Sequence, residues 1–220
     1  MTALPPRTLN RLAKERRIME AALKVFADQG YSGTSMDAIA ALAGVSKPTL
    51  YQYFGSKEQL FAAIMVAQRD SMLGAFEEPD GLGLVPELWA FAWHYADTVL
   101  RPDFLSLARL IIGEAQRFPE IGRAYQAAGP ERVLNGMMDY LNAKRAEGSL
   151  SFDDAELAAE DMWGLILSAP RNRALHDPAN LPSRADLHRF ISNGLRVFLK
   201  AYSTNPANDL AQLNALCEQG

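Results

Sequence analysis

Residues 45–60, VSKPTLYQYFGSKEQL, constrain the fold most, because they start two helices only ten positions apart. Ser46 is a favourable N-cap for the first helix, and its side chain can accept a backbone N–H there. Val45 and Leu50 flank this cap with the spacing of a hydrophobic staple. Pro48 falls in the first turn, where the N–H that it lacks is not needed.

The first of these helices is expected to end soon after it begins. Gly55 predicts its end, and Ser56 with Gln59 has the spacing of a capping box for the next helix. Leu50 and Phe54 are one turn apart, so both are expected to face a core. The stretch therefore predicts one short helix followed directly by another.

Two further helices are predicted before this stretch. The apolar residues of the first lie on one helical face, at i, i+4, i+7 and i+8, and are Ile18, Ala22, Val25 and Phe26. Those of the second repeat at i, i+3, i+4 and i+7, and are Met36, Ile39, Ala40 and Ala43. Gly30 and Gly44 predict the helix ends, and Thr34 and Ser35 are both suitable N-caps for the second helix.

A short helix, a three-residue turn with a glycine and a second short helix form a helix-turn-helix. The second helix of that motif lies in the DNA major groove. Its predicted exposed residues are Lys47, Thr49, Tyr51, Gln52 and Tyr53. Lysine, threonine and glutamine can read base edges, whereas the tyrosine hydroxyls and Lys57 can reach phosphates. The alternative for each tyrosine is a half-buried packing role.

The charge distribution fits a DNA contact made by the N-terminal part. Residues 1–57 hold eight Lys and Arg and four Asp and Glu, a balance of +4, although the whole chain carries -4. The remaining residues hold 14 basic and 22 acidic side chains, a balance of -8. A basic head on an acidic body favours nucleic-acid binding by the head alone, although an excess this small also arises by chance.

The residues from Ile18 to Phe61, above all TSMDAIAALAGVSKPTLYQYFGSKEQLF, resemble the DNA-binding head of TetR-type transcriptional regulators. The segment RLIIGEAQRFPEIGRAYQAAGPERV, Arg109 to Val133, is similar to the C-terminal domain of the AefR-like branch. The resemblance implies a homodimeric repressor whose body binds a small molecule and then releases DNA. Together with the residues themselves, it gives the candidate DNA-binding set Thr34, Ser35, Ser46, Lys47, Pro48, Thr49, Tyr51, Gln52, Tyr53 and Lys57. Pro48 departs from the small residue that the family often has there.

Beyond Leu60 the signals stay helical, and we predict an all-α fold. The expected helices lie near 57–77, 85–101, 103–117, 120–128, 131–147, 153–169 and 184–202. We expect a three-helix helix-turn-helix DNA-binding domain at 10–58 and a larger helical ligand-binding and dimerisation domain at 59–202. A loose tail is expected at 203–220.

No catalytic or metal-binding constellation is found in the sequence. His94, His176 and His188 lie far apart without metal-ligand spacing, so we expect no enzyme, metal or cofactor. The chain has a single cysteine, Cys217, and no apolar run of about 20 residues. We therefore expect a cytoplasmic protein that does not enter a membrane.

The helix predicted at 85–101 is apolar nearly all round, which is typical of the centre of a bundle. Part of its surface is expected to line a cavity for a hydrophobic effector. The candidate ligand-binding residues are Trp89, Trp93, His94, Phe104, Leu107, Ile111, Met137 and Met138. The alternative is that these side chains are solid core.

The last two long helices carry wide apolar stripes that predict a dimer interface. Gly194 costs about 1 kcal/mol relative to alanine inside a helix, so a close backbone approach is expected there. The candidate interface residues are Leu165, Ile166, Leu187, Phe190, Ile191, Gly194, Leu195 and Phe198. The alternative is that these stripes pack within one chain.

The leading hypothesis is a homodimeric repressor that binds a palindromic operator and is released by a small hydrophobic effector. The alternative is an all-helical small-molecule-binding or interaction module that recognises no specific operator.

Overall fold

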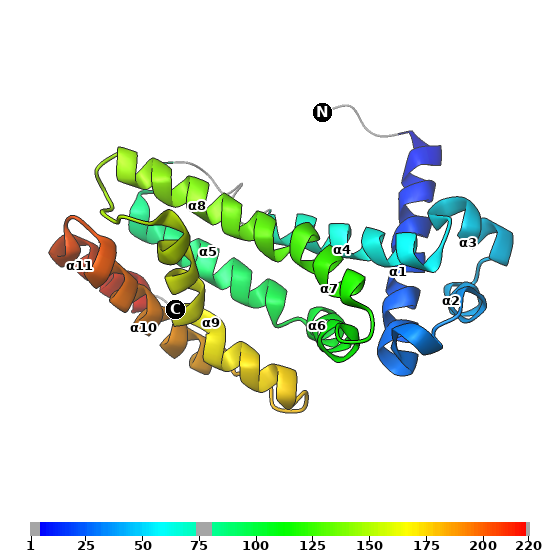
Figure 1. Cartoon of the computed structure of the whole chain (residues 1–220). Helices are drawn as coiled ribbons and strands as arrows, with labels where there is room; N and C mark the ends of the chain where they lie inside the picture. The colour runs from blue at the N-terminus through cyan, green and yellow to red at the C-terminus, as the bar shows by residue number, and fades with distance from the viewer. Residues whose placement is uncertain (1–4, 74–80, 219–220) are drawn as a thin grey trace. The chain divides into compact units, whose positions relative to one another are not determined.

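A computed structural model describes residues 5–73 and 81–218, and every element that it contains is an α-helix (Figure 1). The helices are α1 (Pro6–Gly33), α2 (Met36–Ala43), α3 (Lys47–Phe54), α4 (Lys57–Leu73), α5 (Leu84–Val99), α6 (Pro102–Glu114), α7 (Pro119–Ala128), α8 (Pro130–Ala146), α9 (Ala155–His176), α10 (Arg184–Tyr202) and α11 (Pro206–Cys217). Within these described ranges the only β feature is an isolated bridge between Leu150 and Ser203. The predicted all-α fold is confirmed.

The chain forms two compact units whose boundary differs from the predicted one. The head unit comprises residues 1–68 and 106–129, and the body unit comprises residues 69–105 and 130–220. We call the buried cluster of the head unit, which includes Ile18, Phe26, Leu50 and Phe61, the head core. Leu107, Ile111 and Ile121 of α6 and α7 also belong to it. The predicted domain at 10–58 leaves out most of α4 and all of α6 and α7, which contribute residues to the head core.

The first three helices follow the predicted caps closely. Gly30 has φ 70° and interrupts α1, and Gly44 has φ 64° and ends α2. Glycine adopts such positive φ angles without strain because it has no Cβ. The side chain of Ser35 accepts the N–H of Ala38, and that of Ser46 accepts the N–H of Thr49. These caps set the directions of α2 and α3.

The start of α4 forms only part of the predicted capping box. The hydroxyl of Ser56 accepts the N–H of Gln59 over 3.2 Å. The N–H of Ser56, however, donates to the carbonyl of Phe54, and the amide of Gln59 lies over Gly55 instead. The backbone turn thus supplies the acceptor that the glutamine was expected to give.

In the body unit, α5 packs against α9, α10 and α11, while α8 packs against α9. We call the buried cluster of this unit, which includes Leu88, Met137, Ile166 and Phe198, the body core. The close approach expected at Gly194 is present: a Cβ there would lie 2.7 Å from the carbonyl oxygen of Leu165. The glycine lets α10 cross α9 within one chain.

Two elements differ from the predicted ones. α9 runs on to His176 through Pro170, which was expected to end it; Pro170 is buried in line with Ile166 and Ala174, and this burial offsets the missing hydrogen bond. Residues 74–77 of the predicted fourth helix lie outside the described residues.

The second difference is the expected loose tail, which is largely the helix α11. Asn205 caps this helix and Pro206 begins it, while Leu213 is fully buried in the body core. The apolar side chains at 210, 213 and 216 have helical spacing and cover α5 and α10. Residues 219 and 220 of the predicted tail lie outside the described residues.

No helix among the described residues is both long and apolar enough to cross a membrane.

Candidate DNA-binding interface and body pocket

The turn from α2 to α3 has the geometry of a helix-turn-helix. α2 ends at Ala43, Gly44 takes the left-handed conformation, and α3 begins at Lys47. The N–H of Val45 donates to the carbonyl of Ala40 over 3.0 Å, which closes the turn. Leu50 is fully buried and fixes α3 to the head core.

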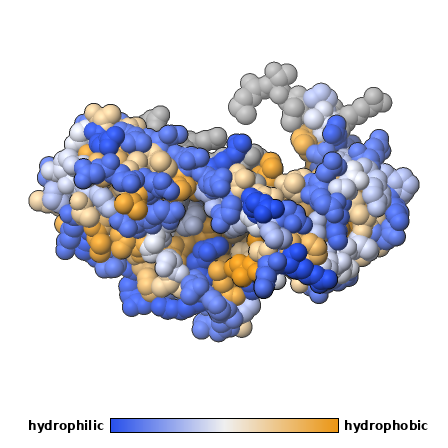
Figure 2. All heavy atoms as spheres, in the orientation of Figure 1, coloured by the Kyte–Doolittle hydropathy of each residue, from blue (hydrophilic) through white to orange (hydrophobic). Residues whose placement is uncertain are grey.

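The outward side of α3 holds the predicted reading residues. Lys47, Pro48, Tyr51 and Gln52 are exposed, as is Ser46 before them. Hydrophilic spheres dominate the region of α2 and α3 (Figure 2). The exposed set can supply an ammonium, an amide and a phenol to DNA.

Thr49 and Tyr53, by contrast, are half-buried. The hydroxyl of Thr49 lies 2.8 Å from that of Ser46, so the two share a hydrogen bond. Tyr53 packs against the head core and lies 6.3 Å from the Phe54 ring, measured between centroids. Of the two tyrosines, Tyr51 is thus the more available to DNA.

Lys47 is already paired with a carboxylate of α2. Its Nζ lies 2.8 Å from Oδ1 and 3.0 Å from Oδ2 of Asp37, and this hydrogen bond raises the pKa of Lys47. Both side chains are more than half exposed. Exposed ion pairs contribute little to stability, so Lys47 can exchange this partner for DNA at small cost.

Thr34 and Lys57, two predicted DNA contacts, are used inside the head unit. Thr34 is buried, and its hydroxyl donates to the carbonyls of Gly30 and Val25 over 2.7 and 3.3 Å. Its prediction as a side-chain DNA contact was wrong, because the hydroxyl satisfies the carbonyls around the interruption of α1. Ser35 beside it is exposed and caps α2.

The ammonium of Lys57 holds the end of α1 beside the start of α4. Its Nζ donates to the carbonyl oxygens of Tyr31 and Thr34 over 2.8 and 3.2 Å and lies 4.5 Å from the centre of the Tyr31 ring. Two of its three N–H donors are therefore engaged within the head unit. A lysine that only binds phosphate would be expected to keep its ammonium unpaired in the absence of DNA.

Tyr31 is a residue that the sequence did not single out. It is buried against Phe26, Phe61 and Phe118, and its hydroxyl lies 3.5 Å from the carboxylate of Glu58. Burial, followed by the nearby negative charge of Glu58, raises the pKa of Tyr31 to about 12. The sequence signal that could have identified Tyr31 is its position directly after Gly30, the glycine that was predicted to end the first helix.

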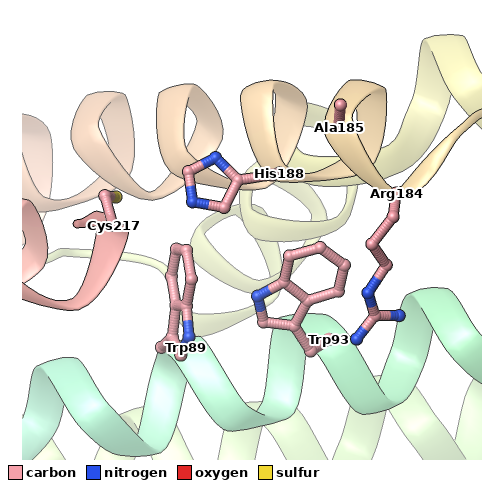
Figure 3. A pocket seen from close by; sticks show the side chains of 6 residues that line it. All are labelled: Trp89, Trp93, Arg184, Ala185, His188 and Cys217. Atoms are coloured by element: carbon pink, nitrogen blue, oxygen red, sulfur yellow. The ribbon is translucent and has the colours of Figure 1, made fainter. Parts of the chain in front are cut away.

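The body unit contains a pocket of about 630 Å³ between α5, α10 and α11 (Figure 3). Its lining residues are Trp89, Trp93, Arg184, Ala185, His188 and Cys217. Two of the predicted ligand residues, Trp89 and Trp93, therefore lie together on one wall.

The other predicted ligand residues do not join them. Phe104, Met137 and Met138 belong to the body core, and His94 is half-buried outside the lining of the pocket. Leu107 and Ile111 are buried in the head core. The sequence could not show which predicted ligand residues belong to which core, because α6 contributes side chains to both the head core and the body core.

Most of the predicted dimer residues are buried within one chain. Ile166, Leu187, Ile191, Gly194, Leu195 and Phe198 are all buried in the body unit. Their assignment to an intermolecular interface was wrong, because these stripes form the contact between α9 and α10 and the core beneath it. Only Leu165 and Phe190 of the predicted set remain partly exposed.

Two family models match the chain. The model of bacterial regulatory proteins of the tetR family matches residues 18–64. The model of the C-terminal domain of AefR-like transcriptional repressors matches residues 86–204.

Curated relatives match over different shares of the chain. The transcriptional activator FasR of Mycolicibacterium smegmatis is 42% identical over 72 residues, which are 31% of this chain and 33% of FasR. The uncharacterized regulator YhgD of Bacillus subtilis is 28% identical over 159 residues, 70% of this chain and 81% of YhgD. The chain thus aligns with about a third of FasR and most of YhgD.

Solved structures match most of the chain. A TetR-family regulator from Mesorhizobium loti is 31% identical with a TM-score of 0.77, covering 88% of this chain and 98% of that one. The flavonoid-responsive regulator FrrA is 35% identical with a TM-score of 0.72, covering 87% of this chain and 98% of FrrA.

A helix-turn-helix in a basic head, joined to an all-helical body, defines the chain as a DNA-binding transcriptional regulator rather than an enzyme. It belongs to the TetR family, with a C-terminal domain of the AefR-like kind.

Proposed function

We propose that the chain is a homodimeric, sequence-specific repressor that a small hydrophobic effector releases from a palindromic operator. The observation that carries the proposal is the arrangement of α3, in which buried Leu50 anchors the helix while Lys47, Tyr51 and Gln52 remain exposed. A recognition helix needs this combination of rigid anchoring and outward polar groups. The repressor role is supported by the description of the AefR-like family model.

We assign separate roles to the exposed and half-buried residues of α3. Lys47, Thr49 and Gln52 read base edges, because ammonium, hydroxyl and amide groups can bond them in the major groove. Tyr51 and Tyr53 contact phosphates through their hydroxyls. Ser35 and Ser46 lie at helix starts, where backbone N–H groups attract phosphate.

The dimer interface that we propose uses the outer surfaces of α9 and α10 instead of their buried stripes. Leu157 of α9 and Val197 of α10 are 63% and 41% exposed. Phe190 lies between the guanidinium groups of Arg173 and Arg189, at 5.4 and 5.0 Å. A second copy of the chain would cover these apolar groups by two-fold symmetry.

An effector in the body would act on the head through α6, which is one continuous helix. Phe104 of α6 is buried in the body core, whereas Leu107 and Ile111 are buried in the head core. An effector that prefers one packing of the body would thereby change the head, since only differential affinity shifts such an equilibrium. The name of FrrA, a flavonoid-responsive regulator, supports an aromatic effector.

A gel-shift titration with the DNA upstream of the chain's own gene tests operator recognition. We expect retardation at physiological salt that a shuffled sequence of the same composition does not give. Equal retardation of both DNAs would instead support the binding module without a specific operator.

The direction of regulation needs a separate measurement. We expect deletion of the gene to raise transcription from the bound promoter, as loss of a repressor does. A fall in transcription would make the chain an activator, the role that FasR's name gives to that relative.

A further inference from the structure

The body pocket has aromatic walls from two helices. Trp89 and Trp93 lie one turn apart on α5, with ring centroids 5.9 Å apart and planes at 74°. His188 of α10 faces them, 5.6 Å from Trp89 and 6.3 Å from Trp93 (Figure 3). Ala185 on the same helix also lines the pocket. Walls of this kind favour a flat aromatic ring, which can stack on one indole and meet another edge-on.

Two polar groups of α10 lie at the same pocket. Arg184 and His188 are one helical turn apart, and the guanidinium carbon of Arg184 lies 3.9 Å from the centre of the Trp93 ring. This contact places the guanidinium beside the Trp93 ring. The Nε2 atom of His188 is buried and has no hydrogen-bond partner. Because this nitrogen has almost no accessible surface, a ligand in the pocket contacts the imidazole through its ring.

We propose that this pocket binds a planar aromatic carboxylate. The ring lies against Trp89 and Trp93, and the carboxylate accepts hydrogen bonds from Arg184. A planar guanidinium matches the two oxygens of a carboxylate. The volume of about 630 Å³ is within the range of small-molecule sites.

Asp97 decides between a carboxylate and a more highly charged anion. Its carboxylate pairs with Nη1 of Arg184, and both side chains are more than half exposed. The site therefore holds one positive and one negative group before ligand enters. A phosphate dianion would be repelled by Asp97, whereas a monoanion can share the remaining N–H donors of Arg184.

The proposal names the effector class for the function proposed above and rests on that function for its regulatory meaning. Binding itself can be tested without DNA, by isothermal titration calorimetry of the full chain with 2-naphthoate and with its neutral analogue 2-naphthamide. We expect naphthoate to bind about tenfold more tightly, a difference of about 1.4 kcal/mol, because its hydrogen bond with Arg184 is charge-assisted.

Variants separate the charge contact from the aromatic walls. Arg184→Gln should remove the preference for naphthoate, whereas Arg189→Gln, an exposed arginine of α10 outside the pocket lining, should leave it unchanged. Asp97→Asn should strengthen naphthoate binding about two- to fivefold without affecting naphthamide, because it releases an exposed ion pair. Trp89→Leu should weaken both compounds.

Equal affinities for naphthoate and naphthamide would overturn the proposal, as would equal losses in Arg184→Gln and Arg189→Gln. So would naphthoate binding weaker than about 1 mM. The gel shift decides operator recognition independently. If naphthoate binds but does not release specifically bound DNA, the carboxylate site stands and its role as the effector site fails.

Discussion

The backbone N–H of Tyr31 donates a hydrogen bond of 3.1 Å to the carboxylate of Glu114, 83 residues further along the chain. Glu114 is the last residue of α6, and Tyr31 follows the interruption of α1 at Gly30. The fit is close, since a Cβ on Gly30 would lie 2.9 Å from Oε1 of Glu114. The end of α6 thereby satisfies a backbone donor beside the DNA-reading helices.

Glu114→Ala should lower the free energy of unfolding of the head by about 1–3 kcal/mol, because the N–H of Tyr31 then has no partner. Urea unfolding measures the loss. Glu114→Gln keeps an acceptor oxygen and should lose less, and Glu120→Ala, at an exposed carboxylate of α7, is the matched control. Similar losses in Glu114→Ala and Glu120→Ala would contradict a specific role for this bond.

The raised pKa of Tyr31 predicts a loss of stability at high pH. The phenol has an ordinary pKa of 10.0 and a folded pKa of about 12, so the folded state holds this proton more tightly. Its contribution is complete below pH 10 and disappears as the pH rises towards 12. Tyr31→Phe should lose less stability over that interval than the unchanged chain.

Spectrophotometric titration gives a second measurement of the same phenol. One late-titrating phenolate should disappear in Tyr31→Phe. Tyr202→Phe should remove a second late-titrating phenolate, because a hydrogen bond to Asp161 raises the Tyr202 pKa to about 12, and the two losses should add in the double variant. If Tyr31→Phe leaves the titration curve unaltered, the buried phenol is not the group responsible.

The pair between Asp37 and Lys47 predicts a gain of function. Asp37→Asn should raise operator affinity about two- to fivefold at low salt, because it releases Lys47 and removes a negative charge near DNA. Lys47→Ala should weaken binding and relax discrimination at particular base pairs. Fluorescence anisotropy with operator and shuffled DNA measures both effects, and a loss of affinity in Asp37→Asn would show that Asp37 positions Lys47 instead.

Adjacent residues of α10 separate dimerisation from folding. Val197→Glu, at a 41% exposed position, should give folded monomers that bind the operator weakly. Phe198→Glu, at a fully buried position, should unfold the body because it buries an unpaired charge. Light scattering and circular dichroism report the two properties. A dimer that survives Val197→Glu would move the interface away from this surface.

Two glycines test the crossing of α9 and α10. Gly194→Ala should lower the free energy of unfolding by about 1–3 kcal/mol, because the added Cβ meets the backbone of Leu165. Gly164→Ala has open space around its Cβ and should raise it by about 0.5–1 kcal/mol through helix propensity. Thermal unfolding measures both variants. Equal shifts in Tm would contradict the prediction, because they would show that the crossing of α9 and α10 tolerates a methyl group at Gly194.

Local signals in the sequence were enough to predict the helix-turn-helix. Ser35, Gly44 and Ser46 cap or end helices through bonds that reach only a few residues along the chain, so short stretches determine α2 and α3. Leu50 at the centre of α3 indicated which side is buried. The missed helix α11 had similar signals at Asn205 and Pro206, and its apolar residues were outweighed by a polar composition.

The partners of each helix were decided by the tertiary structure alone. Periodicity shows that Leu195 and Phe198 lie on an apolar stripe, but it does not tell whether the stripe meets another part of its own chain or a second copy. The same limit placed Leu107 and Ile111 with the wrong core and left Tyr31 and Glu114 unconnected. The physical reason is that helix formation depends on neighbours within about four residues, whereas packing depends on contacts that the folded chain brings together across its length.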